Sequence, residues 1–270
     1  MFELPNDPLL QHLKTVAFGT EFRKALDTIR VAKTGGLIVI GDPGTPGVPA
    51  TVDSICEGGF VLNTPFSAAR LAELSKMDGA VLVSSCLSTI RSANVHLTPH
   101  PTPTTETGMR HRTAECVARQ IQGAVVIAIS KRNDTITLFL AGEKYVLLDK
   151  VRLLAESSHP IDMAEFYGRG YSDAISNLLS LKSPDTIKHD LKLINQLRDK
   201  LFSTIWTSGC HNAELGTDGD IINARLTKVV KAVNVAAAAL EQISGAIVRD
   251  RQTTRTAEFR IIDHSSMGFG

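Results

Sequence analysis

The chain has 270 residues, of which 43% are hydrophobic and 21% charged, and its formal net charge is +1. These proportions are those of a soluble globular protein of one or two domains. So small a net charge excludes a general electrostatic attraction to nucleic acid or to an anionic membrane, and any anion site must be local. The four cysteines are scattered without a CxxC pair, and no apolar run approaches the ~20 residues of a membrane-spanning helix. We therefore expect a cytoplasmic protein with reduced thiols and no membrane association.

The first part of the chain alternates helical and strand-like patterns. Apolar residues recur at helical spacing over residues 8–33, around a break at Gly19, and over 67–77, which Ser67 can cap. The segments expected to form strands, the last of them a hairpin turning near Gly142, are 35–41, 79–85, 89–97, 123–130 and 135–148. Such alternation predicts an α/β domain over residues 1–150, with a mixed, twisted β-sheet flanked by helices.

The second part, residues 151–270, has few strand signals and is expected to be an all-α region. Helical patterns run over 183–206, where Ser183 precedes Pro184, and over 220–248. The small-residue stretch "NVAAAALEQ" favours close helix packing, with packing between subunits as one form of it. We predict a helical linker and oligomerisation region whose tail, from Arg251, stays unassigned.

A basic triplet stands out in the stretch "TETGMRHRTAECVARQ", Thr105 to Gln120. The apolar residues Ala114, Val117, Ala118 and Ile121 follow at helical spacing, which predicts a helix that begins near Thr113. Arg110, His111 and Arg112 then lie at or just before its first turn, where unpaired backbone N–H groups and the helix dipole favour an anion. Guanidinium groups grip phosphate oxygens bidentately, so this pattern predicts a phosphate site. A solvated basic turn that caps the helix is the alternative.

An aspartate precedes one of the expected strands in the stretch "KMDGAVLVSS". Asp78 beside Gly79 is typical of a turn. Strand ends of α/β sheets are also where ligands and metal ions bind, and a carboxylate near a polyphosphate suits Mg²⁺ or Mn²⁺. The sequence thus leaves both a turn and a metal site open for Asp78.

These segments together resemble the DisA family of diadenylate cyclases. The resemblance rests on "DGA" at 78–80, "ANVHL" at 93–97 and "TETGMRHRTAE" at 105–115, with "GGLIVIG" and "LAELSKMDGA" in matching order. It covers the first part of the chain and continues more weakly into "ELGTDGDIINARL" at 214–226, which looks like the helical linker of that family. The fold it implies is a diadenylate cyclase (DAC) domain followed by this linker.

The resemblance implies a reaction and a cellular role. Diadenylate cyclases condense two ATP into the second messenger cyclic di-AMP and release two pyrophosphates, across an interface where two catalytic domains face each other. A single domain holds half of the reactants, so the resemblance implies a homo-oligomer of facing dimers, with an octamer as one assembly. The same resemblance connects the chain to a DNA damage checkpoint.

The resemblance also assigns roles to residues. Asp78 is expected to bind Mg²⁺ or Mn²⁺ and to help to activate the attacking hydroxyl, and Leu97 to pack near the adenine. The other residues expected to line the nucleotide are Gly79, Ala80, Gly108, Met109, Arg110, His111, Arg112, Thr113 and Ser130. Catalysis is assigned to Asp78, Arg110, His111, Arg112 and Thr113.

The alternative roles of these residues are structural. Leu97 can be a core residue, Ser130 can cap a strand, and His111 can be a packed histidine that titrates near neutral pH. Behind Ser130, the pair Lys131–Arg132 is a further phosphate candidate or a solvated turn.

The sequence departs from the family pattern at two places. Cys116 stands where relatives commonly have arginine, which we expect to weaken the local potential without abolishing activity. Nothing after Arg251 shows the glycine-containing hairpins of the helix-hairpin-helix domain with which DisA proteins continue, so DNA binding is not expected to carry over.

A catalytically weak or inactive regulatory protein that binds ATP or cyclic di-AMP is the alternative function. A change in assembly through the helical region would produce it, because misplacing two opposed sites by about 1 Å costs about 10²-fold in rate.

Overall fold

The structure, a computed structural model, describes the backbone of residues 8–42, 51–180 and 184–265. Side chains are described in these ranges except at 179, at 184–188 and from 243 onward. The chain divides into two compact units, an α/β unit of residues 6–156 and 210–220, and a helical unit that includes 157–209 and the residues from 221 onward.

The α/β unit is built on an eight-stranded sheet in the order β2-β5-β4-β1-β6-β7-β8, with β3 also paired to β5. The strands are β1 (Gly36–Ile40), β2 (Cys56–Glu57), β3 (Phe60–Pro65), β4 (Ala80–Val83), β5 (Thr89–Leu97), β6 (Val125–Ile129), β7 (Ile136–Leu140) and β8 (Glu143–Leu147). β1 pairs with β4 in parallel, whereas the other pairs are antiparallel. The mixed sheet predicted from the sequence is therefore confirmed.

The edge strands β2 and β3 were not expected from the sequence. Almost all of their residues are exposed, including Phe60, Val61 and Leu62, and two glycines separate the two strands. A strand without a buried face shows no alternation of apolar and polar residues, and the sequence pattern gives no sign of it.

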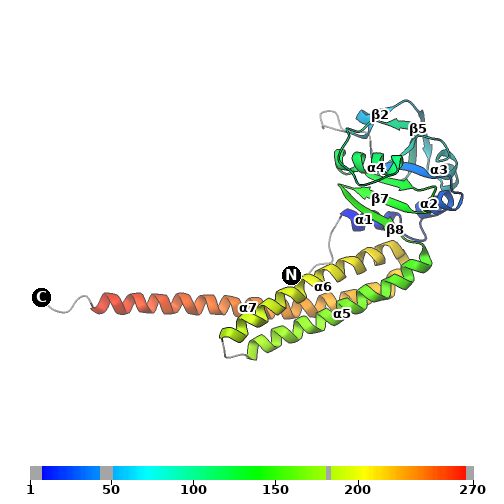
Figure 1. The fold of residues 1–270 in the computed structure, drawn as a ribbon. Helices are drawn as coiled ribbons and strands as arrows, with labels where there is room; N and C mark the ends of the chain where they lie inside the picture. Colours follow the sequence, from blue (N-terminus) through cyan, green and yellow to red (C-terminus); the bar gives the residue numbers. More distant parts are fainter. Residues whose placement is uncertain (1–7, 43–50, 181–183, 266–270) are drawn as a thin grey trace. The chain divides into compact units, whose positions relative to one another are not determined.

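Helices cover both faces of the sheet (Figure 1). On one face α2 (Glu21–Val31) packs against α3 (Ala68–Leu74), and both approach Gly36 of β1, where an added Cβ would lie 3.5 Å from Ile29 and 3.4 Å from Ser75. On the other face α4 (Met109–Gln120) packs on β1, β6 and β7, and shares a buried apolar cluster with their alternate residues. The unit is thus a three-layer α/β/α arrangement, as its alternating pattern predicted.

Two helix ends show how the local sequence sets these layers. The predicted break at Gly19 is present, because this residue has φ +91° between α1 (Pro8–Thr15) and α2. Ser67 caps α3 as predicted, since its hydroxyl accepts a hydrogen bond from the N–H of Arg70 at 3.3 Å.

The start of α4 differs from the prediction. The helix begins at Met109 and not near Thr113, and the N–H of Arg112 donates to the carbonyl of Gly108 at 2.9 Å. The apolar periodicity begins only at Ala114, where the helix meets the core. The prediction from periodicity therefore did not include the polar first turn of the helix. The basic triplet consequently lies inside the first turns of the helix.

The helical unit consists mostly of three long helices, α5 (Lys150–Ser180), α6 (Pro184–Leu215) and α7 (Asp220–Ser265). They share an apolar core, and α5 and α7 approach closely at Gly168, where an added Cβ would lie 3.3 Å from Val229 and 3.4 Å from Val233. On the surface of this unit, Arg225 forms ion pairs with Asp162 and Glu165 at 2.6 and 2.7 Å. An all-α second region is what the sequence predicted.

Residues 210–220 fold with the α/β unit although they lie far along the chain. Glu214 is fully buried and pairs with the buried guanidinium of Arg23 at 3.0 Å. It also accepts hydrogen bonds from the hydroxyl of Tyr145 at 3.0 Å and the N–H of Leu148 at 2.8 Å. Burial raises the pKa of Glu214, while Arg23 and the hydrogen bonds oppose that shift. Through Glu214, these contacts attach residues 210–220 to the α/β unit.

Candidate functional site

Four strands bring predicted site residues to one end of the sheet. β1 and β4 run parallel and begin at this end, while β5 and β6 run antiparallel to them and finish there, as the pairs Ala80–Val95 and Gly36–Ile129 show. We call this region, residues 34–36, 78–80, 94–97 and 129–131, the sheet end. Residues far apart in sequence, from Asp78 to Ser130, are therefore neighbouring positions along one edge of the fold.

Asp78 and Gly79 form the entry to β4. The side chain of Asp78 is exposed. Gly79 packs so tightly on β5 that an added Cβ would lie 2.3 Å from the carbonyl carbon of Asn94, and its N–H donates to Asn94 Oδ1 at 3.2 Å. The amide of Gly79 thus has a partner inside the protein, and only a residue without a side chain fits against β5 at this point.

The first turn of α4 points to the same sheet end. In the last turn of the helix, Arg119 contacts Gly142, which lies between β7 and β8, with its Cγ 3.5 Å from a Cβ built there. Arg110, in the first turn, instead reaches Gly35 before β1. The free N–H groups and the positive end of the helix dipole are therefore directed to the sheet end, where they favour an anion.

Two cationic side chains converge over Gly35. This glycine has φ +69°, and an added Cβ would lie 2.6 Å from Nη1 of Arg110 and 2.8 Å from Cγ of Lys131. Only glycine fits this conformation and this close approach without strain. Among the residues that the structure describes, neither Arg110 nor Lys131 has a carboxylate partner within ion-pair distance. The half-buried guanidinium of Arg110 and the exposed side chain of Lys131 are therefore candidates to bind an anion of high charge.

The other residues of the basic turn point elsewhere. At 3.6 residues per turn, Arg112 projects roughly 200° away from Arg110, and its side chain is exposed. His111 is half-buried with its ring edge toward Phe139, 6.2 Å between ring centroids. Burial lowers the pKa of His111, with Lys144 and Arg110 acting in the same direction and Glu106 against it.

The remaining residues of this turn have plainer environments. Met109 is 80% exposed, and Thr113 is half-buried. Gly108 has ordinary extended backbone, and an added Cβ would meet only Nδ1 of His111 at 3.5 Å, so packing inside the chain does not require glycine there.

Leu97, Ala80 and Ser130 have structural roles at the sheet end. Leu97 and Ala80 are 7% and 1% exposed and belong to the apolar cluster under α4. The hydroxyl of Ser130 accepts hydrogen bonds from the N–H groups of Arg132 at 3.3 Å and Asn133 at 3.1 Å, and so caps the turn after β6. Their contacts with a ligand stay predictions.

Sequence reasoning missed the residues that hold the loop before α4. Glu115 is buried, accepts a hydrogen bond from the hydroxyl of Thr104 and pairs with Arg119 at 2.5 Å. Arg119 in turn donates to the carbonyl of Pro103 at 2.9 Å. The signal was a glutamate and an arginine at i, i+4 in the helix after a proline-rich loop. These contacts fix the loop that leads into the basic turn.

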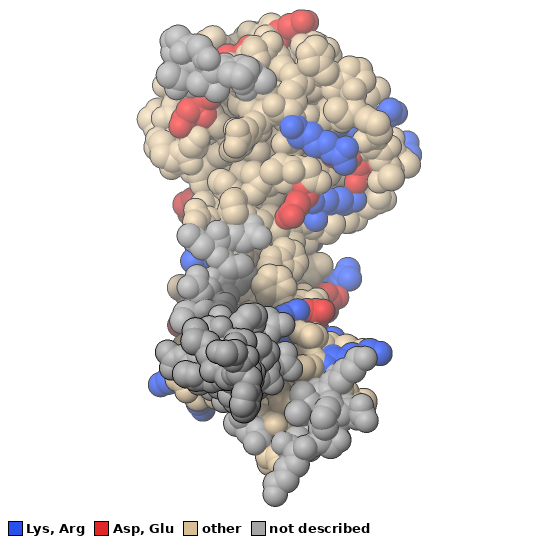
Figure 2. Space-filling view, turned by 90° about the vertical axis from the view of Figure 1, so that its left-hand side faces the viewer, with Lys and Arg blue, Asp and Glu red and all other residues tan. Residues whose placement is uncertain are grey.

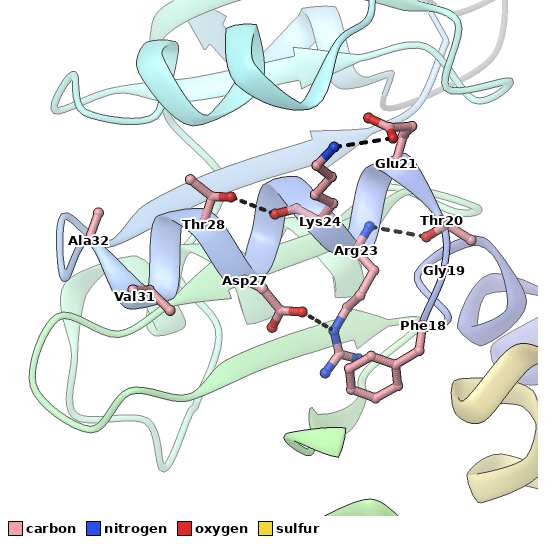
Figure 3. Close-up of a pocket in the computed structure, with 10 residues that line it drawn as sticks. All are labelled: Phe18, Gly19, Thr20, Glu21, Arg23, Lys24, Asp27, Thr28, Val31 and Ala32. Carbon is pink, nitrogen blue, oxygen red and sulfur yellow. Dashed lines mark hydrogen bonds and ion pairs between the residues drawn. The ribbon is translucent and has the colours of Figure 1, made fainter. Parts of the chain in front are cut away.

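A separate hollow lies along α2 (Figure 3). It is a groove of about 650 Å³ lined by Phe18, Gly19, Thr20, Glu21, Arg23, Lys24, Asp27, Thr28, Val31 and Ala32. Figure 3 shows Arg23 directed toward Asp27 and beside the ring of Phe18, 3.8 Å from ring centroid to guanidinium carbon. None of the predicted site residues lines this groove.

Three further observations concern the surface charges, metal-ligating side chains and helix apolarity of the described residues. On the face shown in Figure 2, basic and acidic side chains lie in small interspersed groups among the coloured residues. Within the described part of the chain, no three histidine, cysteine or acidic side chains gather as a metal site. Nor does any helix of that part have the length and apolarity to cross a bilayer.

Comparison with known proteins bears on the class to which the chain belongs. The α/β unit is of a known class, since the family model described as "DisA bacterial checkpoint controller nucleotide-binding" matches residues 23–144. The chain is 39% identical to the DNA integrity scanning protein DisA of Clostridium acetobutylicum over 244 residues, 90% of this chain and 64% of the relative. It is 34% identical to DisA of Bacillus licheniformis over 270 residues, 94% of this chain and 72% of the relative. Among solved structures, DacA from Staphylococcus aureus is similar over 55% of this chain and 93% of the DacA chain. The two are 20% identical in sequence, and the TM-score is 0.38.

The chain belongs to the DisA family. It spans roughly two thirds of the length of these relatives, 64% of the first and 72% of the second.

Proposed function

We propose that the protein is a diadenylate cyclase, which converts two ATP into cyclic di-AMP and two pyrophosphates. The observation that carries the proposal is the meeting of the Arg110 guanidinium and the Lys131 side chain over Gly35, neither with a carboxylate partner among the described residues, at the sheet end where β4 begins after Asp78. A triphosphate offers the concentrated negative charge that such a pair, together with the start of α4, can neutralise.

The proposed reaction proceeds by two equivalent displacements. In each, the 3′-hydroxyl oxygen of one ATP attacks the α-phosphorus of the other, the bond to pyrophosphate breaks, and the hydroxyl proton leaves to a nearby base or water. Arg110 and Lys131 hold the phosphates, and Asp78 orients the attacking hydroxyl. Because Arg112 projects away from Arg110, we assign it to a different part of the bound nucleotides. Most of the rate gain then comes from positioning and charge neutralisation.

A divalent cation at this site would be bound by Asp78 together with the phosphates of the substrate. Asp78 is exposed and supplies a single carboxylate, and Mg²⁺ often uses one or two carboxylates together with substrate phosphates. We propose that Asp78 would hold Mg²⁺ or Mn²⁺ with the phosphate oxygens, and that the ion would supply charge neutralisation.

The proposal requires a second copy of the chain. One α/β unit presents one sheet end and therefore one triphosphate site. A dimer with two-fold symmetry places two loaded sites opposite each other, and this is the simplest assembly that completes the reaction.

The test is formation of cyclic di-AMP from ATP with Mg²⁺ or Mn²⁺, followed by mass spectrometry. Asp78→Asn should lower the rate by about 10²–10⁴-fold, as expected for loss of an acid–base or metal-binding group, while ATP binding measured by calorimetry persists. The matched control is Asp134→Asn, an exposed aspartate on the turn after β6 with positive φ, which should retain activity. A folded wild-type dimer that binds ATP and forms no product would contradict the cyclase and leave the regulatory nucleotide binder.

A further inference from the structure

β5 contains a bulge directly opposite the entry to β4. The register shifts between the pairs Ala80–Val95 and Leu82–Ser92, so that β5 has one residue more than β4 in this interval. Asn94 lies in the interval and has φ +55°, in the left-handed region. Asparagine tolerates that region better than most residues, and a bulge of this kind redirects a side chain next to it.

Two glycines enclose Asn94. An added Cβ at Gly79 would lie 2.3 Å from the Asn94 carbonyl carbon and 2.6 Å from its Cα. On the other side of β5, just before β3 begins, an added Cβ at Gly59 would lie 3.1 Å from the Asn94 carbonyl oxygen and 2.8 Å from that of Ala93. Contact this close from both sides leaves the backbone of Asn94 little room to move.

The side chain of Asn94 makes a specific contact with the turn before β4. Its Oδ1 accepts the hydrogen bond from the N–H of Gly79 at 3.2 Å, fifteen residues away in sequence. Gly79 directly follows Asp78, so the contact restricts the peptide from which the Asp78 carboxylate projects. A half-buried N–H without this partner would cost free energy, and the turn would seek another conformation.

We propose that Asn94 is a positioning residue for Asp78: through the Gly79 amide it fixes the direction of that carboxylate toward the nucleotide. The inference rests on the proposed function, because it concerns the same site. A displacement of about 1 Å at a reacting group can cost about 10²-fold in rate, whereas nucleotide affinity depends on Arg110 and Lys131, which Asn94 does not contact.

The experiment compares three variants of the full chain. Asn94→Gly keeps the left-handed backbone accessible and removes the acceptor, while Asn94→Asp keeps both an acceptor oxygen and tolerance of positive φ. Asn63→Gly is the matched control, an exposed asparagine with φ +44° on β3. Each is measured for kcat and KM with ATP, and for exchange of the Gly79 amide proton by NMR.

We expect Asn94→Gly to lower kcat at least about tenfold, to change the KM for ATP by less than about threefold, and to accelerate Gly79 exchange. Asn94→Asp should restore slow exchange and most of kcat, and Asn63→Gly should match the wild type. The inference is overturned if Asn94→Gly behaves like Asn63→Gly, or if Asn94→Asp loses as much kcat as Asn94→Gly.

One measurement needs no variant and separates the two proposals. In the wild-type protein the Gly79 amide should exchange slowly, and exchange at the rate of an unprotected amide overturns the role of Asn94 even if the protein is an active cyclase. Conversely, a wild-type protein that forms no cyclic di-AMP would contradict the proposed function. The exchange data would then still decide whether Asn94 holds the Asp78–Gly79 turn in place.

Discussion

The α2 groove and the sheet end each contain a prominent arginine, and the surroundings of the two are opposite. Arg23, in the groove, is 2% exposed, pairs with Asp27 at 3.1 Å and Glu214 at 3.0 Å, and donates to the carbonyl of Leu148. Arg110, at the sheet end, lies over Gly35 together with the side chain of Lys131 and has no carboxylate partner among the described residues. The charge of Arg23 is already satisfied by the fold, whereas that of Arg110 is available to a ligand.

The groove along α2 is a hollow of about 650 Å³, and its arginine maintains the attachment of residues 210–220. The sheet end offers unpaired positive charge, a helix start and close backbone approach at Gly35. The second combination has the features that favour a ligand of high negative charge, which is why we place the proposed site there.

Removal of Arg23 should have the largest effect on stability. Arg23→Ala leaves the fully buried Glu214 without its cationic partner, and breaking such a pair typically costs about 3–5 kcal/mol of unfolding free energy. The measurement is chemical denaturation at neutral pH. Arg225→Ala is the control, since this arginine has two carboxylate partners on the surface of the helical unit and should cost about 1 kcal/mol or less. Equal losses in the two variants would remove the structural role assigned to Arg23.

Removal of Arg110 should act on the reaction and spare the fold. Arg110→Ala deletes a positioned cation, which we expect to lower kcat/KM for ATP by about 10²–10³-fold, with a change in unfolding free energy within about 0.5 kcal/mol. Lys24→Ala, a change of an exposed cation in the α2 groove, should leave activity unaltered. If Lys24→Ala lowered activity more than Arg110→Ala, the groove and not the sheet end would be the nucleotide site.

A smaller effect should appear in the dependence of stability on pH, with opposite signs in the two regions. Burial lowers the pKa of His111 below its ordinary value of 6.5, so the folded protein takes up this proton less readily than the unfolded chain. Stability associated with His111 is therefore lost as pH falls below about 6.5. Burial raises the pKa of Glu214 above its ordinary value of 4.5, so the folded protein holds this proton more tightly than the unfolded chain. The stability linked to Glu214 is therefore lost as pH rises above about 4.5.

Denaturation of His111→Gln between about pH 7.5 and pH 5.5 tests the first part. The variant should lose less stability on acidification than the wild type, and the difference should disappear at the upper end of the range. His159→Gln, at an exposed position of α5, controls for the loss of any histidine. A steeper loss in His111→Gln would show that the sign is wrong.

Local sequence pattern was enough to predict the elements with buried faces. The run Gly36–Ile40 and the run Val125–Ile129 are buried throughout and became central strands, and the spacing of Ala114, Val117 and Ala118 became the inner face of α4. The family followed from "DGA", "ANVHL" and "TETGMRHRTAE", because their order and residue types are visible without coordinates. Each of these features depends on local pattern, which the chain carries in its residues.

Which of these residues meet depends on the packing of the folded chain. The parallel pairing of β1 with β4 and the antiparallel pairing of β6 bring Asp78, Gly35 and Lys131 to one end of the sheet. The turn of α4 separates Arg110 from its near neighbour Arg112, and a bulge places Asn94 against Gly79. Strand order, register and helix rotation arise from the packing of the whole core, so contacts between distant residues cannot be obtained from local spacing.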